Sequence, residues 1–312
     1  MDLVTHVFRI PLRTRFRRVT ERTGVLLQGP HGWGEFSPFA EYGPEVAVPW
    51  LRCAIESATS EAPEPLRNSI PVNVTVPAVD PQRAYDIVGN SSCSTAKVKV
   101  AEPGPLEEDE ARVEAVRDAL GPQGKLRVDA NGAWSVDEAQ RAIRALDRYD
   151  LEYVEQPVAT LDDMATLRRS IDVPLAADES VRTAEDPMRV AGLEGADIVV
   201  LKVQPLGGVR RALEIAEAVG LPCVVSSAVE TSVGTATGLA LAACLPELPY
   251  ACGLATLELL EGDVVAESLR PVGGAIPVRR PEPDPDLLER WRADEDTEQR
   301  ELARLRATEA LL

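Results

Sequence analysis

The sequence predicts an α/β protein built around a closed barrel of parallel strands, with a smaller α+β layer at the start of the chain. The 312 residues exceed one ordinary domain but suit a (β/α) barrel that carries a modest accessory layer. From about Pro71 to Leu260, short β-type runs alternate with amphipathic helical stretches, which is typical of βαβ units. The repeat of roughly 20 to 30 residues matches one strand, one helix and their loops.

The first 70 residues follow a different pattern, and we expect them to form an α+β capping domain over residues 1–70. Strand-like segments occupy residues 4–10 and 24–27, and a helix is expected over residues 46–60. Between them lies the Gly/Pro-rich stretch GPHGWGEFSPFAEYGP, residues 29–44. A loop is expected over its residues 29–38.

Eight β-type runs predict the catalytic barrel, which we place at residues 71–262. The runs are residues 71–76, 96–100, 125–130, 151–156, 173–179, 196–203, 222–228 and, more weakly, 252–259. Eight strands fit a closed barrel. Helical segments such as SVDEAQRAIRALDRY, residues 135–149, have apolar residues at three- and four-residue intervals, so one face of each helix is expected to pack on the sheet.

The strand and helix repeat stops after about Glu261, and residues 263–312 are expected to pack back on the capping domain. This segment contains a strand-like AIPV at residues 275–278 and the Pro-rich PEPDPD at residues 281–286. A charged terminal helix follows.

The composition excludes several classes of protein. Hydrophobic residues make up 45% and charged residues 27% of the chain, and no run approaches the roughly 20 apolar residues of a membrane helix. The N-terminus lacks the basic start and apolar middle of a signal peptide, so a cytoplasmic location is expected. A net charge of -18 argues against a nucleic-acid partner and leaves a small-molecule substrate as the expected partner. The five cysteines are widely spaced and are expected to be free core thiols.

Three acidic residues end consecutive predicted strands, namely Asp129, Glu155 and Asp178. In a (β/α) barrel the carboxyl ends of the strands converge on one mouth, so these side chains are expected to form a cluster. Three anions at one mouth repel one another unless a cation neutralises them, and oxygen ligands favour Mg²⁺, with Mn²⁺ also possible. Glu152 and Glu179 are alternative ligands, because a strand pattern leaves the facing uncertain by one residue.

Three lysines flank this predicted cluster. Lys97 and Lys99 are two residues apart on the second barrel strand, so both should point into the barrel, and each should lower the pKa of the other. Lys202 lies near the end of the sixth strand, on the opposite side of the carboxylates. A substrate carboxylate on the metal would lie between two amines, which predicts removal of a proton α to that carboxylate.

These motifs resemble the enolase superfamily, and specifically its o-succinylbenzoate synthase branch. The resemblance is carried by AKVKV (96–100), RVDANGAW (127–134), EYVEQP (152–157), AADES (176–180), VVLKVQPLGG (199–208), SSAVETSVG (226–234) and GLATLEL (253–259). It implies a modified (β/α)₇β, TIM-like barrel under a capping domain built from both chain ends. It also implies dehydration of 2-succinyl-6-hydroxy-2,4-cyclohexadiene-1-carboxylate to o-succinylbenzoate, a step toward menaquinone.

The resemblance assigns roles to individual residues. Lys99 takes the α-proton, with Lys97 as its tuning neighbour, and Lys202 stabilises the enediolate as a cation. The implied Mg²⁺ ligands are Asp129, Glu155 and Asp178. The implied substrate-binding residues are Arg127, Asn131, Ser226 and Ser227. The loop at residues 29–38 is expected to close over the substrate, with Trp33 and Phe36 either excluding water there or packing the capping layer.

Two alternatives remain open from the sequence. Racemisation of N-succinylamino acids would use both lysines as acid and base, and Lys99 with Lys202 would permit it. Dipeptide epimerisation is less favoured, because Cys252, Gly253 and Leu254 stand where related epimerases carry a D-x-D pair. The other alternative is a non-catalytic barrel that binds an anionic ligand. It is disfavoured because Lys99, Lys202 and the three carboxylates are all present.

Overall fold

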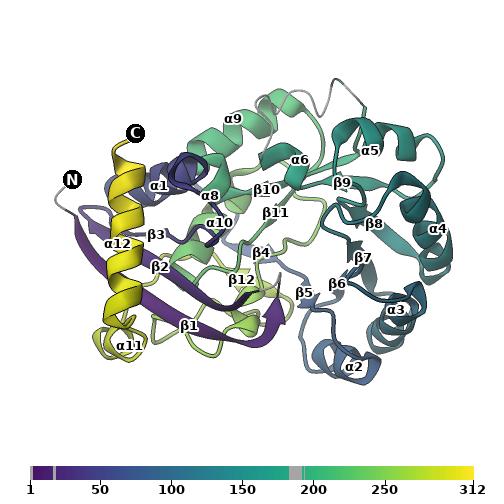
Figure 1. Ribbon diagram of the computed structural model, residues 1–312, viewed down its shortest axis with the longest axis horizontal. Coiled ribbons are helices and arrows are strands. Elements are labelled where there is room, and N and C mark those ends of the chain that lie inside the picture. Colours follow the sequence, from purple (N-terminus) through teal and green to yellow (C-terminus); the bar gives the residue numbers. More distant parts are fainter. Residues whose placement is uncertain (1–2, 17–18, 183–191, 193) are drawn as a thin grey trace.

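The computed structural model describes residues 3–16, 19–182, 192 and 194–312. It contains a three-stranded antiparallel sheet, a curled parallel sheet of seven strands and helices around both (Figure 1). The predicted α/β class is therefore confirmed. No helix in the described part of the chain combines the length and apolar character needed to cross a bilayer.

The capping sheet consists of β1 (Val4–Phe16), β2 (Val19–Gly29) and β3 (Gly32–Phe36), paired in that order. Alternation along β2 directs Val25 and Leu27 into a cluster with helix α1 (Pro44–Thr59), while Leu26 joins the core cluster of the barrel. The two strands and the helix expected in this segment are confirmed, but the expected loop at residues 29–38 is wrong in part, because residues 32–36 pair with β2 as the strand β3. Because its two faces are both apolar, the sheet lies between α1 and the barrel.

The C-terminal segment returns to this sheet. Helix α12 (Glu295–Glu309) packs on α1, β1 and β2, as Figure 1 shows at the left of the molecule. Ahead of it lie β12 (Ala275–Pro277) and α11 (Pro285–Arg290). The strand β12 pairs antiparallel with β4 (Ser69–Pro71), which is the link between the capping sheet and the barrel.

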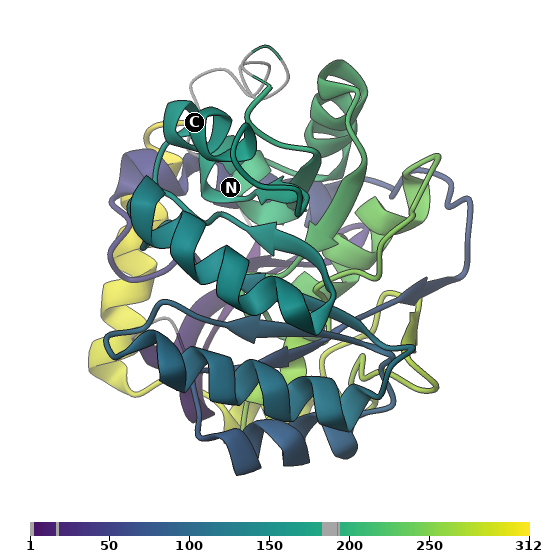
Figure 2. The ribbon, with the colours of Figure 1, turned by 90° about the vertical axis from the view of Figure 1, so that its right-hand side faces the viewer.

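The barrel strands pair in the order β5 to β11, all parallel. They are β5 (Val74–Val76), β6 (Thr95–Lys99), β7 (Lys125–Asp129), β8 (Leu151–Glu155), β9 (Leu175–Ala177), β10 (Ile198–Lys202) and β11 (Cys223–Ser226). The described helices between or after them are α2 (Pro81–Gly89), α3 (Leu106–Leu120), α4 (Val136–Leu146), α5 (Leu161–Arg168), α6 (Glu179–Arg182), α8 (Val203–Leu206), α9 (Val209–Val219) and α10 (Ser232–Cys244). In Figure 2 the blue and teal helices lie side by side on the outside of the parallel strands.

The eighth predicted strand, residues 252–259, is wrong beyond its first two residues. Cys252 bridges to Val72 and Gly253 bridges to Ser226, so these two residues join the first and last strands and close the barrel. The chain then turns into the 3₁₀ helix η2 (Thr256–Leu259). A short buried apolar run has the same composition in a strand and in such a helix, so the pattern could not distinguish them.

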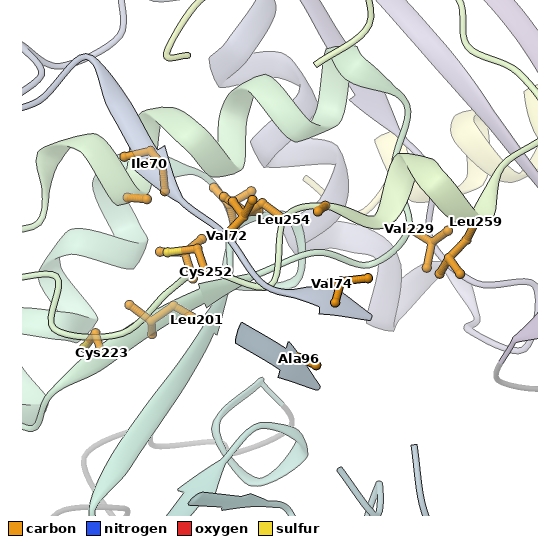
Figure 3. Packing of buried hydrophobic residues seen from close by; sticks show 14 of the residues in the cluster. Ile70, Val72, Val74, Ala96, Leu201, Cys223, Val229, Cys252, Leu254 and Leu259 are labelled. Atoms are coloured by element: carbon orange, nitrogen blue, oxygen red, sulfur yellow. The ribbon is translucent and has the colours of Figure 1, made fainter. Parts of the chain in front are cut away.

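The closure is packed with apolar side chains. Figure 3 shows Cys252 and Leu254 beside Val72, with Ile70 and Val74 farther along the same segment on either side. All five cysteines are free, and four of them are buried, which confirms their predicted role as small core residues.

Candidate active site

Five charged side chains gather where the central strands of the barrel end. Lys99, Asp129 and Glu155 close β6, β7 and β8, and the register pairs Lys99 with Asp129 and Asp129 with Glu155. Asp178 directly follows β9, and Lys202 closes β10. Parallel neighbours in a barrel deliver their carboxyl ends to one mouth, so consecutive strands build this cluster. All five side chains are at least nine-tenths buried.

The lysines and carboxylates of the cluster neutralise one another. Lys97 Nζ donates to both carboxylate oxygens of Glu155 at 2.7 Å and lies 3.3 Å from Asp129 Oδ2. Lys99 Nζ donates to Asp129, and Lys202 Nζ donates to Asp178. Three ammonium groups thus face three carboxylates, and these pairs offset part of the large cost of burying the charges.

The number of lysines in the chain also points to this site. The chain has only four lysines against many arginines, and three of the four meet in this cluster. The fourth, Lys125, is exposed at the start of β7. Lysine is the cation that exchanges a proton when buried, whereas arginine stays charged. The scarcity of lysine elsewhere is therefore a sequence signal for this site in addition to the motifs.

The surroundings shift the pKa values of the two lysines of β6 in opposite directions. Burial acts to lower the pKa of Lys97, but the negative charges of Glu155 and Asp129 outweigh it and raise that pKa above its usual range. Burial lowers the pKa of Lys99 despite the opposing charge of Asp129, and the charge of Lys97 adds to the effect. The prediction of a mutual lowering is wrong for Lys97, which has two carboxylates close to its ammonium, and confirmed for Lys99.

The pKa values of Glu155 and Asp129 are also shifted in opposite directions. Burial raises the pKa of Glu155 to about 7, and the negative charge of Asp129 adds to the rise. Burial also acts to raise the pKa of Asp129, but the charges of Lys99 and Lys97 outweigh it and hold that pKa well below its usual range. The cluster thus joins one strongly acidic carboxyl to one that binds its proton more tightly.

The donor set fits a hard divalent cation. Asp129, Glu155 and Asp178 offer only carboxylate oxygens, which are the ligands that Mg²⁺ and Mn²⁺ prefer. The ammonium group of Lys97 lies between Glu155 and Asp129, so this part of the site accommodates a positive charge. As placed, no group of three or more such side chains converges closely enough to hold a metal within the described residues, because each carboxylate is turned toward a lysine.

A cavity opens at the mouth of the barrel, and we call it the central cavity. The three lysines and Asp129 line one part of it. The remaining lining residues are Phe16, Phe39, Thr75, Ser226, Ser227, Ala228, Val229, Gly253 and Thr256. Ser227 Oγ donates to Glu230 and lies 2.6 Å from Thr256 Oγ1. The predicted residues Ser226 and Ser227 are therefore brought to the cavity, next to apolar walls that the sequence had not indicated.

Two predicted substrate-binding residues lie outside this lining. The Arg127 guanidinium is held inside the barrel by Glu152 at 2.6 Å and the carbonyl oxygen of Ala251 at 2.6 Å, and it stacks over Tyr153. Its two-residue offset from Asp129 places it one layer deeper, so it closes the barrel floor. Glu152 is thereby occupied away from the mouth.

Asn131 lies beside the cluster. Its side chain accepts a hydrogen bond from Lys99 Nζ at 2.8 Å and donates to Glu179 at 3.1 Å. It has a left-handed backbone with φ of 47°, a conformation that asparagine tolerates better than most residues. Asn131 therefore orients Lys99 and engages the carboxylate of Glu179.

Residues 29–38 do not form the expected loop over the substrate, because residues 32–36 belong to β3. Residues 29–38 are all described, and none of them lines the central cavity, whereas the next residue, Phe39, does. Phe36 is fully buried in the cluster with α1, and Trp33 Nε1 donates to Glu282. Of the two interpretations offered for Trp33 and Phe36, packing of the capping layer is the one the structure supports.

Comparison with known proteins agrees with this geometry. Residues 7–58 match the family described as Enolase N-terminal domain-like, and residues 82–283 match Enolase C-terminal domain-like. An o-succinylbenzoate synthase of Thermobifida fusca is 61% identical over 301 residues, which cover 96% of this chain and 95% of the relative. The chain belongs to the o-succinylbenzoate synthase family of the enolase superfamily.

A second o-succinylbenzoate synthase, from Mycolicibacterium smegmatis, is 50% identical over 310 residues and covers 98% of this chain and 95% of the relative. Among solved structures, N-succinyl Arg/Lys racemase from Bacillus cereus superposes with a TM-score of 0.78 at 22% identity, covering 94% of this chain and 99% of that chain. At that identity the likeness shows the shared fold. Enolase-superfamily proteins generally use a divalent metal, which agrees with the oxygen donors of the cluster.

Proposed function

We propose that the chain is an Mg²⁺-dependent o-succinylbenzoate synthase, which removes water from 2-succinyl-6-hydroxy-2,4-cyclohexadiene-1-carboxylate. One observation carries the proposal: Lys99 and Lys202 reach one cavity from strands on opposite sides of the carboxylates. Relatives of the same name at 61% and 50% identity support the substrate.

The Mg²⁺ ion would be held by Asp129, Glu155 and Asp178. Their carboxylate oxygens would first lose the hydrogen bonds that the lysines donate to them. When bound, the ion supplies positive charge to the oxygens of the substrate carboxylate. Lys202, as an ammonium group, adds charge from the other side of the cavity. Negative charge that develops on a carboxylate during proton removal is best stabilised by groups already held in place, and Lys202 is buried at the end of β10.

Lys99 performs the proton transfers. Its neutral amine takes the proton α to the carboxylate, and the lowered pKa of Lys99 increases the fraction of amine able to accept it. The resulting ammonium group then gives the proton to the departing hydroxyl. One C–H bond and one C–O bond break, the electron pair of the C–H bond forms a C=C bond, and the C–O pair leaves with the hydroxyl as water. Elimination from one face needs only one acid/base group, and Asn131 keeps that group in position.

The succinyl side chain of the substrate would lie against the far wall of the central cavity. Ser226 and Ser227 supply hydroxyl groups there, and Phe16 and Phe39 supply apolar surface. A polar chain end and an apolar ring are both accommodated by such a lining.

The decisive experiment is a product assay on purified protein with Mg²⁺. Formation of o-succinylbenzoate is expected, with loss of at least a thousandfold in kcat for Lys99→Ala, because the base is removed. Lys125→Ala is the matched control, since Lys125 is the exposed lysine of β7, and it should keep full activity. Addition of a chelator should abolish turnover. Full activity of Lys99→Ala, or activity that survives metal removal, would refute the assignment.

Racemisation of N-succinylamino acids is a second candidate, because Lys99 and Lys202 both line the cavity and could serve opposite faces of one carbon. It predicts deuterium exchange at the α-carbon of both enantiomers of N-succinylphenylglycine. Exchange should be lost for one enantiomer in Lys99→Ala and for the other in Lys202→Ala. No exchange in the unaltered protein would remove this candidate.

A further inference from the structure

Arg22 is a buried arginine of β2 that touches two walls of the central cavity. Its side chain Nε donates to the carbonyl oxygen of Val229 at 3.1 Å, and its Nη2 donates to the carbonyl oxygen of Ser37. Its guanidinium carbon lies 4.3 Å from the centre of the Phe39 ring. Val229 and Phe39 both line the cavity, one from the loop after β11 and the other from the loop after β3.

Val229 has a backbone conformation that needs such support. Its φ is 64°, in the left-handed region, where a β-branched residue is strained. Strained residues persist only where surrounding contacts hold them, and they concentrate at functional sites. The carbonyl group of Val229 is held by Arg22, and its N–H donates to Ser227 Oγ at 2.8 Å. The strained residue is thus fixed on both sides.

The capping layer also holds the end of the same loop. The carboxylate of Glu35 on β3 accepts hydrogen bonds from Thr231 Oγ1 at 2.5 Å and from the N–H of Gly234 at 3.0 Å. These groups lie at the beginning of α10, where unpaired N–H groups favour a negative charge. Glu35 thus fixes the end of the loop, while Arg22 and Ser227 hold Val229 itself.

We propose that Arg22 is a positioning residue for substrate binding. Its guanidinium group holds Val229 in the left-handed conformation and keeps Phe39 against the cavity, and it thereby sets the shape of the wall that receives the substrate side chain. The inference rests on the proposed function and deepens it, because it gives the capping layer a part in substrate fit. A planar guanidinium donates from separate nitrogen atoms held in a fixed plane while its face stacks on a ring, whereas an ammonium group has all its donors on one nitrogen.

Arg22→Lys tests the geometry without removing the charge that balances the nearby carboxylates of Glu35 and Glu230. At saturating Mg²⁺ we expect KM for the cyclohexadiene substrate to rise at least tenfold while kcat stays within threefold. Amide hydrogen exchange over residues 226–231 should become at least tenfold faster. Unchanged KM with unchanged exchange, or a fall in kcat at constant KM, would overturn the proposal. Arg22→Met provides a second variant that removes the donors altogether.

A second comparison tests the link to strain at Val229. Glycine adopts a φ of 64° freely, whereas alanine removes nearly the same side-chain atoms but keeps the strain. Arg22→Lys should therefore raise KM less than threefold in a Val229→Gly background and about tenfold in a Val229→Ala background. Equal effects in the two backgrounds would refute the role of Arg22 in holding this conformation.

The exchange measurement separates this inference from the proposed function, because it needs no substrate. If the unaltered protein forms no o-succinylbenzoate, the proposed function fails. The positioning role of Arg22 is still tested by exchange over residues 226–231 in Arg22→Lys: faster exchange supports it, and unchanged exchange contradicts it.

Discussion

Replacing Lys97 by methionine should destabilise the metal-free protein strongly and make its stability depend on a divalent cation. The ammonium group of Lys97 lies 2.7 Å from both oxygens of Glu155 and 3.3 Å from Asp129. The three side chains are at least 94% buried, since their exposed fractions are 6%, 1% and 1%. Removing one partner of a buried ion pair costs about 3–5 kcal/mol, because the remaining charge is left without compensation.

The assay is thermal unfolding of Lys97→Met and of the unaltered protein, each in chelator and in excess Mg²⁺. In chelator the variant should unfold at a temperature lower by roughly 6 °C or more. Saturation with a ligand at about one hundred times its Kd adds about 2.7 kcal/mol to a folded state. Because Mg²⁺ would replace the missing positive charge between Glu155 and Asp129, it should raise the unfolding temperature of the variant more than that of the unaltered protein.

The control is Lys125→Met, since Lys125 is exposed at the start of β7. It should unfold within about 0.5 kcal/mol of the unaltered protein, as expected for a surface change, with an unchanged response to Mg²⁺. If Lys97→Met in chelator unfolded at the same temperature as this control, Lys97 would not be compensating the buried carboxylates. If Mg²⁺ raised the unfolding temperature of Lys97→Met less than that of the unaltered protein, the ion would not be replacing the ammonium group of Lys97.

Three further changes test other parts of the molecule. Lys202→Ala should lower kcat of the dehydration at least a hundredfold in the product assay, because the ammonium group that faces the developing charge is lost, and full activity would contradict that role. Gly34→Ala should cost about 1–3 kcal/mol in urea unfolding, because the added carbon would lie 1.9 Å from the carbonyl oxygen of Ala54, whereas Gly89→Ala, with no atom within 4 Å, should not destabilise the protein. Burial raises the pKa of Glu35 from 4.5 to about 7, so the folded state binds the proton more tightly, and this contribution to stability, about 3 kcal/mol, is present below pH 4.5 and lost as pH rises to about 7. Glu35→Gln should make the free energy of unfolding less dependent on pH over that range. An unchanged pH dependence would show that another group causes it.

The sequence by itself determined the barrel and the order of its charged groups. Residues such as Lys99, Asp129 and Glu155 follow buried β-type runs, and consecutive parallel strands of a barrel are neighbours in space. The order of residues along the chain therefore becomes their order around the mouth. This is local information, because a short β-type run and the charged residue at its end are recognised within a few residues.

Only the tertiary structure decided how these groups and the cavity walls are paired. The raised pKa of Lys97 depends on the carboxylate of Glu155, which comes from another strand. The contact of Arg22 with Val229 joins residues 207 positions apart, and the closure at Cys252 depends on a bridge to Val72. Such contacts arise when distant segments bury their polar and apolar groups against each other, and no pattern within one segment records which partner it will meet.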